Sequence, residues 1–239
     1  MQELSWDDVP WAVRRLPKPV RDLLQRHGRK VFLAGGYLRA VIANERVADV
    51  DLFAPSKDYA EACAKELANP EGRRPRRLIE TDNAYTVILK PFPAQFIHRW
   101  TFTDPAAALE SFDFTIAQAA LWWDAEALRW AGACSDRFYQ DLAAKRLVYT
   151  SPNRNEEAGG SMLRVLKFYQ RGYRIPLDSL GAVVARLVRG IEPTKFATDQ
   201  VAKVITGLLR EVDPLIDPNH AAHLPSATDP PGDPAEDGE

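Results

Sequence analysis

The chain contains 239 residues, of which 46% are hydrophobic and 10% aromatic, as in ordinary globular proteins. Its formal net charge of −2 excludes a uniformly basic surface for nucleic acid, so any such surface must be local. Its two cysteines, Cys63 and Cys134, have no metal-binding spacing, and no apolar run approaches the ~20 residues of a membrane-spanning helix. Because no signal-peptide pattern is present, we expect a cytoplasmic protein with reduced thiols.

Helices are the first elements that the sequence predicts, followed by a strand and a glycine turn. Residues 6–27 carry apolar side chains at helical spacing and are expected to cover a sheet in two pieces, divided by prolines. The apolar run 31–33 predicts a buried strand that ends in the turn at Gly35 and Gly36. Helical spacing returns in residues 37–44, which predict a short helix.

Residues 47–53 alternate between apolar and acidic side chains and predict a strand. Strand side chains repeat their direction every two residues, so Val50 and Leu52 share one face and Asp49 and Asp51 the other, with the two carboxylates roughly 7 Å apart. Mg²⁺ favours one or two carboxylates with phosphate oxygens and water. Glycines let backbone amides approach a phosphate closely. The stretch therefore predicts a seat for Mg²⁺ and the phosphates of a nucleotide.

The remaining elements follow from apolar periodicity and turn residues. Ser56 and Asp104 are the expected N-caps of two helices. Four arginines within residues 71–77 either contact nucleic-acid phosphates or form a solvated loop, and the shortness of the run favours the loop. Strands are expected over 78–81, 84–90, 94–101, 114–123, 128–131 and 146–149, and helices over 57–68, 103–110, 135–144, 160–172, 177–190 and 194–212.

Three short motifs, in order, resemble those of a known superfamily. The pattern GGYLRA followed by DVD resembles the first motif, GG-x-[VL]-R-D ending in D-x-D, of the polymerase-beta nucleotidyltransferase superfamily. The nearest resemblance is to its bacterial CCA-adding enzymes and poly(A) polymerases, although Ala40 replaces an acid of the motif. The run 113–116, DFTI, resembles part of the second motif, RRDFTINA, and residues 163–173 resemble the third, LRAVRFAARLGF.

The resemblance implies a fold and a domain order. The implied fold class is α+β: a polymerase-beta-like nucleotidyltransferase head, with a mixed sheet and flanking helices, followed by a short helical neck. We expect the head domain over residues 1–150, a neck-like region over 151–213 and an acidic, proline-rich, disordered tail over 214–239.

The resemblance also implies roles for individual residues. Asp49 and Asp51 would be catalytic and would hold Mg²⁺ or Mn²⁺. A later strand should supply a third carboxylate, but Gln95 stands near its expected place, so another acid, Glu80, Asp82 or Asp104, is needed if the site is complete. The residues expected to bind the nucleotide are Gly35, Gly36, Arg39, Asp113, Arg164 and Lys167, with Asp113 on the ribose.

The implied activity is transfer of an NMP from an NTP to an acceptor hydroxyl, with an RNA or tRNA-like 3′ end as the expected acceptor. Transfer to a protein or a small molecule stays open. So does a degenerate fold that binds nucleotide or RNA without catalysis. Ala40 and Gln95 favour that binder, whereas the intact pair Asp49 and Asp51 favours the enzyme. A third reading is an α+β domain in which these matches arise by chance.

Overall fold

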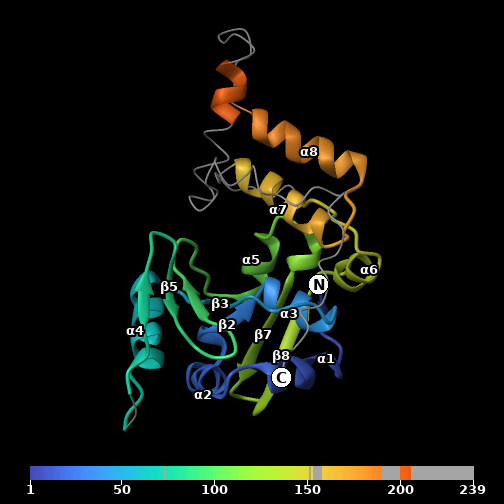
Figure 1. Cartoon of the computed structure of the whole chain (residues 1–239). Helices are drawn as coiled ribbons and strands as arrows, with labels where there is room; N and C mark the ends of the chain where they lie inside the picture. Colours follow the sequence, from blue (N-terminus) through green and yellow to red (C-terminus); the bar gives the residue numbers. More distant parts are fainter. Residues whose placement is uncertain (73, 151, 153–157, 190–199, 206–239) are drawn as a thin grey trace, which may run out of the picture.

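One mixed sheet organises the molecule. The computed structural model describes residues 1–72, 74–150, 152, 158–189 and 200–205. Its eight strands lie in the order β1-β8-β7-β2-β3-β6-β5-β4; β3 and β6 are parallel, and the other neighbours are antiparallel. The strands are β1 (Gln2–Glu3), β2 (Phe32–Ala34), β3 (Val50–Phe53), β4 (Leu78–Glu80), β5 (Ala84–Val87), β6 (Ala94–Ile97), β7 (Ala119–Asp124) and β8 (Arg129–Cys134). This mixed α+β architecture confirms the predicted fold class (Figure 1).

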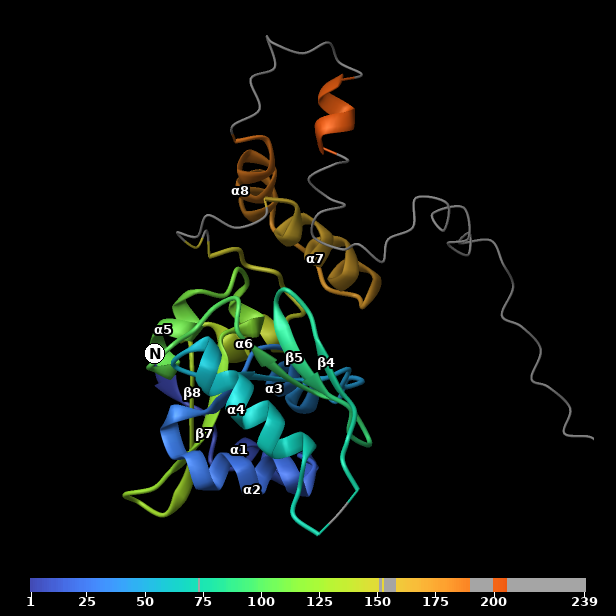
Figure 2. The same cartoon turned by 90° about the vertical axis from the view of Figure 1, so that its left-hand side faces the viewer.

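Helices cover the sheet because its two faces both carry apolar side chains. On one face Val50 and Leu52 belong to the large core, which α1 (Asp8–Arg15), α2 (Lys18–His27) and α4 (Lys57–Ala68) cover (Figure 2). The two N-terminal helices confirm the predicted division near the prolines. Ser56 caps α4 as expected, since its hydroxyl accepts from the amide of Tyr59 at 3.1 Å.

The opposite face of the sheet is only partly covered. Phe32 and Phe53 pack there in a smaller core with α5 (Pro105–Glu110), whose N-cap is Asp104, as predicted. The short helix α3 (Gly36–Ile42) follows β2, and α6 (Phe138–Ala143) follows β8. Since Asp51 and Phe53 are two residues apart on β3, the aspartate shares this half-covered face, which is where the site lies.

Two further helices stack above the head in Figure 1: α7 (Ala158–Gln170) and α8 (Leu177–Val188). Two hydrogen bonds hold them against the head. The amide of Leu147 donates to the carbonyl of Arg174, between the two helices, at 2.8 Å, and the amide of Tyr149 donates to Ser179 Oγ on α8 at 3.2 Å. Residues 200–205 are helical, within the predicted helix 194–212; the rest of that prediction, and the tail 214–239, lie outside the described residues. The predicted division at residue 150 stays a prediction.

Several predicted strands were too long or wrong. β3 begins at Val50 rather than at residue 47, because its neighbour β6 begins only at Ala94 and the amide of Val50 already bonds to the carbonyl of Pro93. β6 ends at Ile97 because the amides of the next two residues both turn to the carbonyl of Asn83.

The predicted strand over 114–123 begins with a short 3₁₀ helix, η2 (Thr115–Ala117), and becomes β7 only at Ala119. Residues 146–149 form isolated bridges, to Arg174 and Phe114, instead of a strand. Neither β1 nor the 3₁₀ helix η1 (Gly28–Lys30) was predicted. Within the described residues, no helix is long and apolar enough to cross a membrane.

Candidate active site

A cavity of about 440 Å³ opens on the half-covered face of the sheet, under α7. This volume lies in the range of small-molecule and cofactor sites. Its lining is strongly charged, and among the described residues cations outnumber acids. The acids are Asp49, Asp51 and Asp113, and the cations are Arg39, Arg46, Arg99, Arg164, Lys167 and Arg171.

The two aspartates that the sequence singled out form the acidic centre of the cavity. Both are half-buried, because they face the cavity on one side and protein on the others. Burial and, to a smaller extent, the neighbouring Asp49 raise the pKa of Asp51, against the lowering effect of Lys167 and Arg164, and the net result is a pKa of about 7. Burial also raises the pKa of Asp49, against the opposing effect of Lys167, Arg171 and Arg39. Two adjacent carboxylates that are costly to ionise provide a site that a bound cation would stabilise.

The amide side chain of Gln95 lies beside this pair. In the parallel register of β3 and β6, Asp51 is opposite Gln95, and both side chains line the cavity. None of the three acids considered as substitutes reaches the cavity. Asp104 caps α5 and pairs with Arg29 at 2.6 Å, and Glu80 lies on the sheet's last strand.

The described residues accordingly contain no group of three His, Cys, Asp or Glu side chains placed to hold a metal ion. Two carboxylates beside an amide oxygen still fit Mg²⁺ or Mn²⁺, which complete their coordination with phosphate and water.

The two glycines of the turn have different surroundings. Gly35 has φ +89°, and its amide already donates to the carbonyl of Ala119 at 2.9 Å. A Cβ on Gly35 would also lie 3.2 Å from the ring of Phe112. Gly36 lines the cavity, and a Cβ there would meet nothing within 4 Å. Of the two glycines expected to contact phosphate, Gly36 is therefore the one with open space beside it in the cavity.

Arg39 lines the cavity but has a partner inside the protein. Its side chain is 5% exposed and forms a salt bridge with Glu45, whose other oxygen accepts from the hydroxyl of Tyr173 at 2.8 Å. The guanidinium also lies 4.9 Å from the ring centroid of Phe168 on α7. Arg39 thus contributes positive charge near Asp49 while its guanidinium is bound to Glu45 rather than to either aspartate.

Asp113 connects the floor of the cavity to α7. One of its carboxylate oxygens accepts from Arg164 Nη1 at 2.6 Å and from Ser161 Oγ at 3.0 Å. Lys167 and Arg171 follow Arg164 at helical spacing and line the same cavity. The structure therefore brings the predicted site residues to one region, and all of them except Gly35 line the cavity.

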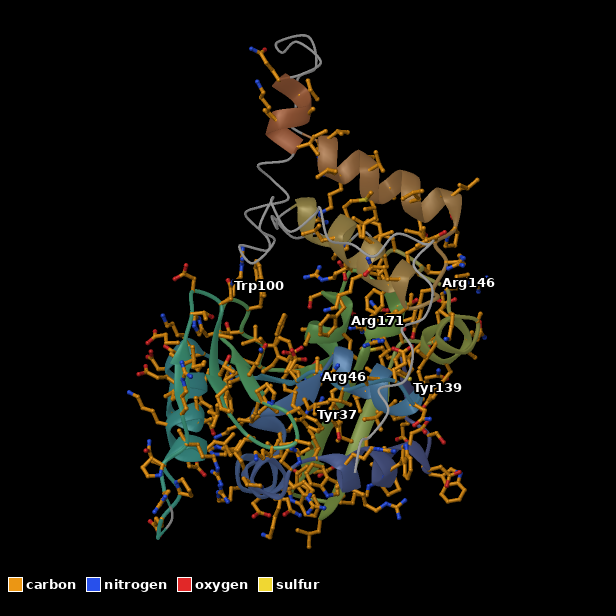
Figure 3. All side chains as sticks on the ribbon, viewed as in Figure 1. Tyr37, Arg46, Trp100, Tyr139, Arg146 and Arg171 are labelled. Carbon is orange, nitrogen blue, oxygen red and sulfur yellow. The ribbon has the colours of Figure 1, made fainter. Side chains whose placement is uncertain are left out.

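The sequence analysis missed four polar or aromatic lining residues that lie just outside β3, β5 and β6. Arg46 precedes β3, Asn83 lies in the β4–β5 turn, and Arg99 and Trp100 follow β6. Figure 3 shows Trp100 on the side of β5 and Arg171 below α7. All four lie in connecting segments, where no periodicity marks a side chain's direction. The one available signal was the aromatic-basic pair Arg99-Trp100 itself.

A model of the Gabija anti-defense 2 family matches residues 12–145, more than half of the chain. The chain belongs to this family. The family match includes the aspartate pair, Gln95 and Asp113, and ends before α7. No match was found among curated proteins.

Solved structures of similar fold include CCA-adding enzymes. A CCA-adding enzyme in complex with ATP superimposes with a TM-score of 0.59 at 16% identity, over 89% of this chain and 50% of that one. The Thermotoga maritima CCA-adding enzyme bound to tRNA gives 0.56 at 18% identity, over 80% and 47%. A complex with CTP gives 0.56 at 16% identity, over 88% and 51%. The chain thus has the nucleotidyltransferase head fold and spans about half the length of these enzymes.

Proposed function

We propose that this protein is a metal-dependent nucleotidyltransferase that moves an NMP from an NTP to an acceptor hydroxyl, with an RNA 3′ end as the acceptor. One observation carries the proposal: the neighbouring Asp49 and Asp51 both line a cavity whose other charges are mostly cationic. A divalent cation and a triphosphate together complement that arrangement. The similarity to structures of nucleotide-bound CCA-adding enzymes supports the same substrate class.

Each group of residues has a separate task in this reaction. Asp49 and Asp51 would hold Mg²⁺ or Mn²⁺, which when bound lowers the pKa of the attacking hydroxyl and neutralises the leaving pyrophosphate. Gly36 would present its amide to the phosphates, and Lys167 and Arg171 would bind their charge. Asp113 would accept a hydrogen bond from the ribose. The acceptor oxygen bonds to the α-phosphorus, the bond from that phosphorus to pyrophosphate breaks, and the hydroxyl proton leaves to solvent.

Gln95 favours a second candidate, a fold that binds nucleotide or RNA without catalysis. It occupies the position beside Asp51 where a third carboxylate would complete the site. One observation speaks against this candidate. Arg39 forms its salt bridge with Glu45 and so does not neutralise the two aspartates. The family's description as anti-defense supports a role for either activity in opposing a Gabija defence. In that case the acceptor could also be a protein or small molecule.

The test is transfer of label from each α-³²P-labelled NTP with Mg²⁺ or Mn²⁺ and total RNA. We expect label in RNA with the wild type and none with the Asp49→Asn/Asp51→Asn double variant. Asp58→Asn, on the exposed start of α4, is the matched control and should transfer normally. Label on protein instead of RNA would show that the acceptor is a protein. Binding of NTP without any transfer would establish the binder instead.

Gln95→Glu separates the two candidates further. It places a third carboxylate opposite Asp51 in the β3–β6 register. In an enzyme with an incomplete site we expect severalfold tighter Mn²⁺ binding and faster transfer, because an added carboxylate strengthens a hard-cation site. In a binder, Mn²⁺ affinity rises while no transfer appears. Isothermal titration with Mn²⁺ alongside the transfer assay distinguishes these outcomes.

A further inference from the structure

The lining of the cavity includes two flanks of different chemistry. One flank, beneath α7, presents Arg164, Lys167 and Arg171. The other flank lies beside β5 and β6 and presents Arg99 and Trp100, together with Asn83. The first flank is cationic and suits phosphates, whereas the second combines an indole ring with a single guanidinium. No role has yet been given to the second flank.

The second flank is held in shape by hydrogen bonds within the protein. The carbonyl of Asn83 accepts from the amides of His98 and Arg99 at 3.0 and 3.2 Å. Arg99 Nη1 donates to Asn83 Oδ1 at 3.1 Å, and its guanidinium carbon lies 5.5 Å from the Trp100 ring centroid. The imidazole of His98 bonds to the carbonyl of Thr81 at 3.1 Å. The indole therefore stands at the cavity on a braced turn, which lowers the entropy cost of binding against it.

A half-buried indole next to an arginine matches one kind of ligand well. Successive bases of single-stranded nucleic acid stack on aromatic side chains, and arginine adds charge for the backbone. Trp100 remains partly open to the cavity, and Arg99 is exposed at its rim. A protein acceptor would gain little from this pair, because its side chains offer no large planar ring followed by a phosphate.

The chemistry of transfer assigns the two flanks to different substrates. In an in-line displacement the attacking and leaving oxygens lie on opposite sides of the phosphorus. If pyrophosphate leaves toward the cations of α7, the attacking hydroxyl must come from the other side of Asp49 and Asp51. In the sheet, β6 lies next to the aspartate strand β3, its Gln95 and Ile97 line the cavity, and Trp100 follows it, so this flank is the candidate for that side.

We propose that Trp100 and Arg99 form the subsite for the last nucleotide of a single-stranded RNA acceptor, with its base stacked on Trp100 and its phosphate bound by Arg99. This inference rests on the proposed function, since it assigns the acceptor side of the same cavity. It makes the acceptor an oligonucleotide and gives it a defined place distinct from that of the NTP.

The test measures binding rather than catalysis, so it does not depend on activity. A short single-stranded RNA labelled with fluorescein at its 5′ end is titrated with the protein and followed by fluorescence anisotropy. We expect Trp100→Ala to weaken RNA binding about tenfold and Trp100→Phe to restore most of it, because stacking needs an aromatic face. In a separate titration with ATP and Mg²⁺, Trp100→Ala should bind ATP within about twofold of the wild type.

Trp6→Ala is the matched control, because Trp6 is 82% exposed and lies outside this cavity. It should bind RNA as the wild type does. Equal RNA affinity in wild type and Trp100→Ala would overturn the proposed subsite. A loss of ATP binding in Trp100→Ala, with RNA unaffected, would also overturn it, because the stacked base would then be that of the NTP. If RNA binds through Trp100 and no nucleotide is transferred, the subsite stands and the transferase proposal fails.

Discussion

At the scale of single residues, the cavity depends on two carboxylates that the fold makes costly to ionise. Asp51 on β3 and Asp49 just before that strand line the same cavity, and burial raises the pKa of both. Such an arrangement is poor for stability by itself, because the unfolded chain ionises the same groups freely. The presence of the pair therefore favours a functional role for the two carboxylates. A bound divalent cation would offset the free-energy cost of ionising them.

The pH dependence of stability follows from this shift. The folded protein holds the Asp51 proton more tightly than the unfolded chain, since the pKa rises from 3.8 to about 7. Metal-free wild type should therefore lose free energy of unfolding as pH rises from about 4 to 7, with no further loss from this group above that range. At pH 8 in EDTA, we expect Asp51→Asn to melt roughly 3 °C or more above wild type, a gap that closes toward pH 4.

Metal should reverse that difference. A cation competes with the proton for the carboxylates, so Mg²⁺ should raise the melting temperature of wild type more at pH 8 than at pH 6. Asp51→Asn should gain little at either pH. Melting curves at three pH values, with and without Mg²⁺, measure both effects. An Asp51→Asn protein that melts below wild type at pH 8 without metal would show that the carboxylate stabilises the fold in its ionised form.

Sequence reasoning was strongest for these residues because strand geometry fixes directions. The alternation around Val50 and Leu52 was enough to predict that the two aspartates share a face, and the register then placed Gln95 beside Asp51. It could not predict that Arg39 would pair with Glu45, since that contact depends on where the segment after α3 returns. Nor could it predict the contribution of Trp100, which lies in a loop.

At the scale of elements, the end of α7 organises the back of the cavity. Gly172 has φ +87°, and the amides of Gly172 and Tyr173 donate back to the carbonyls of Tyr169 and Phe168, both at 3.0 Å. This is a Schellman cap, in which the residue after the glycine folds back on the helix. Tyr173 accordingly packs on Phe168, with ring centroids 5.4 Å apart, and its hydroxyl reaches Glu45. The cap thereby links α7 to α3 through Glu45 and Arg39.

Removing the charge of Glu45 tests that link. Glu45→Gln leaves the buried guanidinium of Arg39 without its counter-charge, so we expect a loss of about 3 kcal/mol in the free energy of unfolding. Urea denaturation followed by tryptophan fluorescence measures it. Glu61→Gln, which breaks an exposed ion pair with Lys65, is the matched control and should leave the midpoint unchanged. Equal midpoints for the two variants would show that Arg39 does not need Glu45.

Helices were predicted better than strands for a physical reason. The apolar stripes of α2 and α4 and the caps Ser56 and Asp104 are local signals, and each helix formed where they indicated. A strand exists only where a neighbour pairs with it, so its ends depend on distant residues. β3 is short because β6 starts late, and residues 115–117 form a 3₁₀ helix because β7 finds its partners only from Ala119.

At the scale of the whole molecule, the distribution of charge matters more than its sum. The net charge is −2, yet the cavity carries more cations than acids. The arginine-rich turn near residue 76 lies at the far end of α4 from α7 in both Figures 1 and 2, and Arg76 donates to the carbonyl of Leu67. A long basic track from that turn to the cavity is therefore not expected. We therefore expect the protein to bind RNA only through the nucleotides at its 3′ end, in the cavity.

This arrangement predicts how RNA affinity depends on salt and on length. With one RNA phosphate bound by Arg99 and the cations of α7 left to the NTP, the logarithm of the association constant should fall against the logarithm of salt concentration with a slope of about −0.7. Affinity should reach a plateau after the first few nucleotides, because further phosphates meet a surface without excess positive charge. Anisotropy titrations with RNAs of increasing length, at several salt concentrations, measure both quantities. A slope that steepens with RNA length would reveal a second basic contact surface and would make the arginines of residues 74–77 the first to replace.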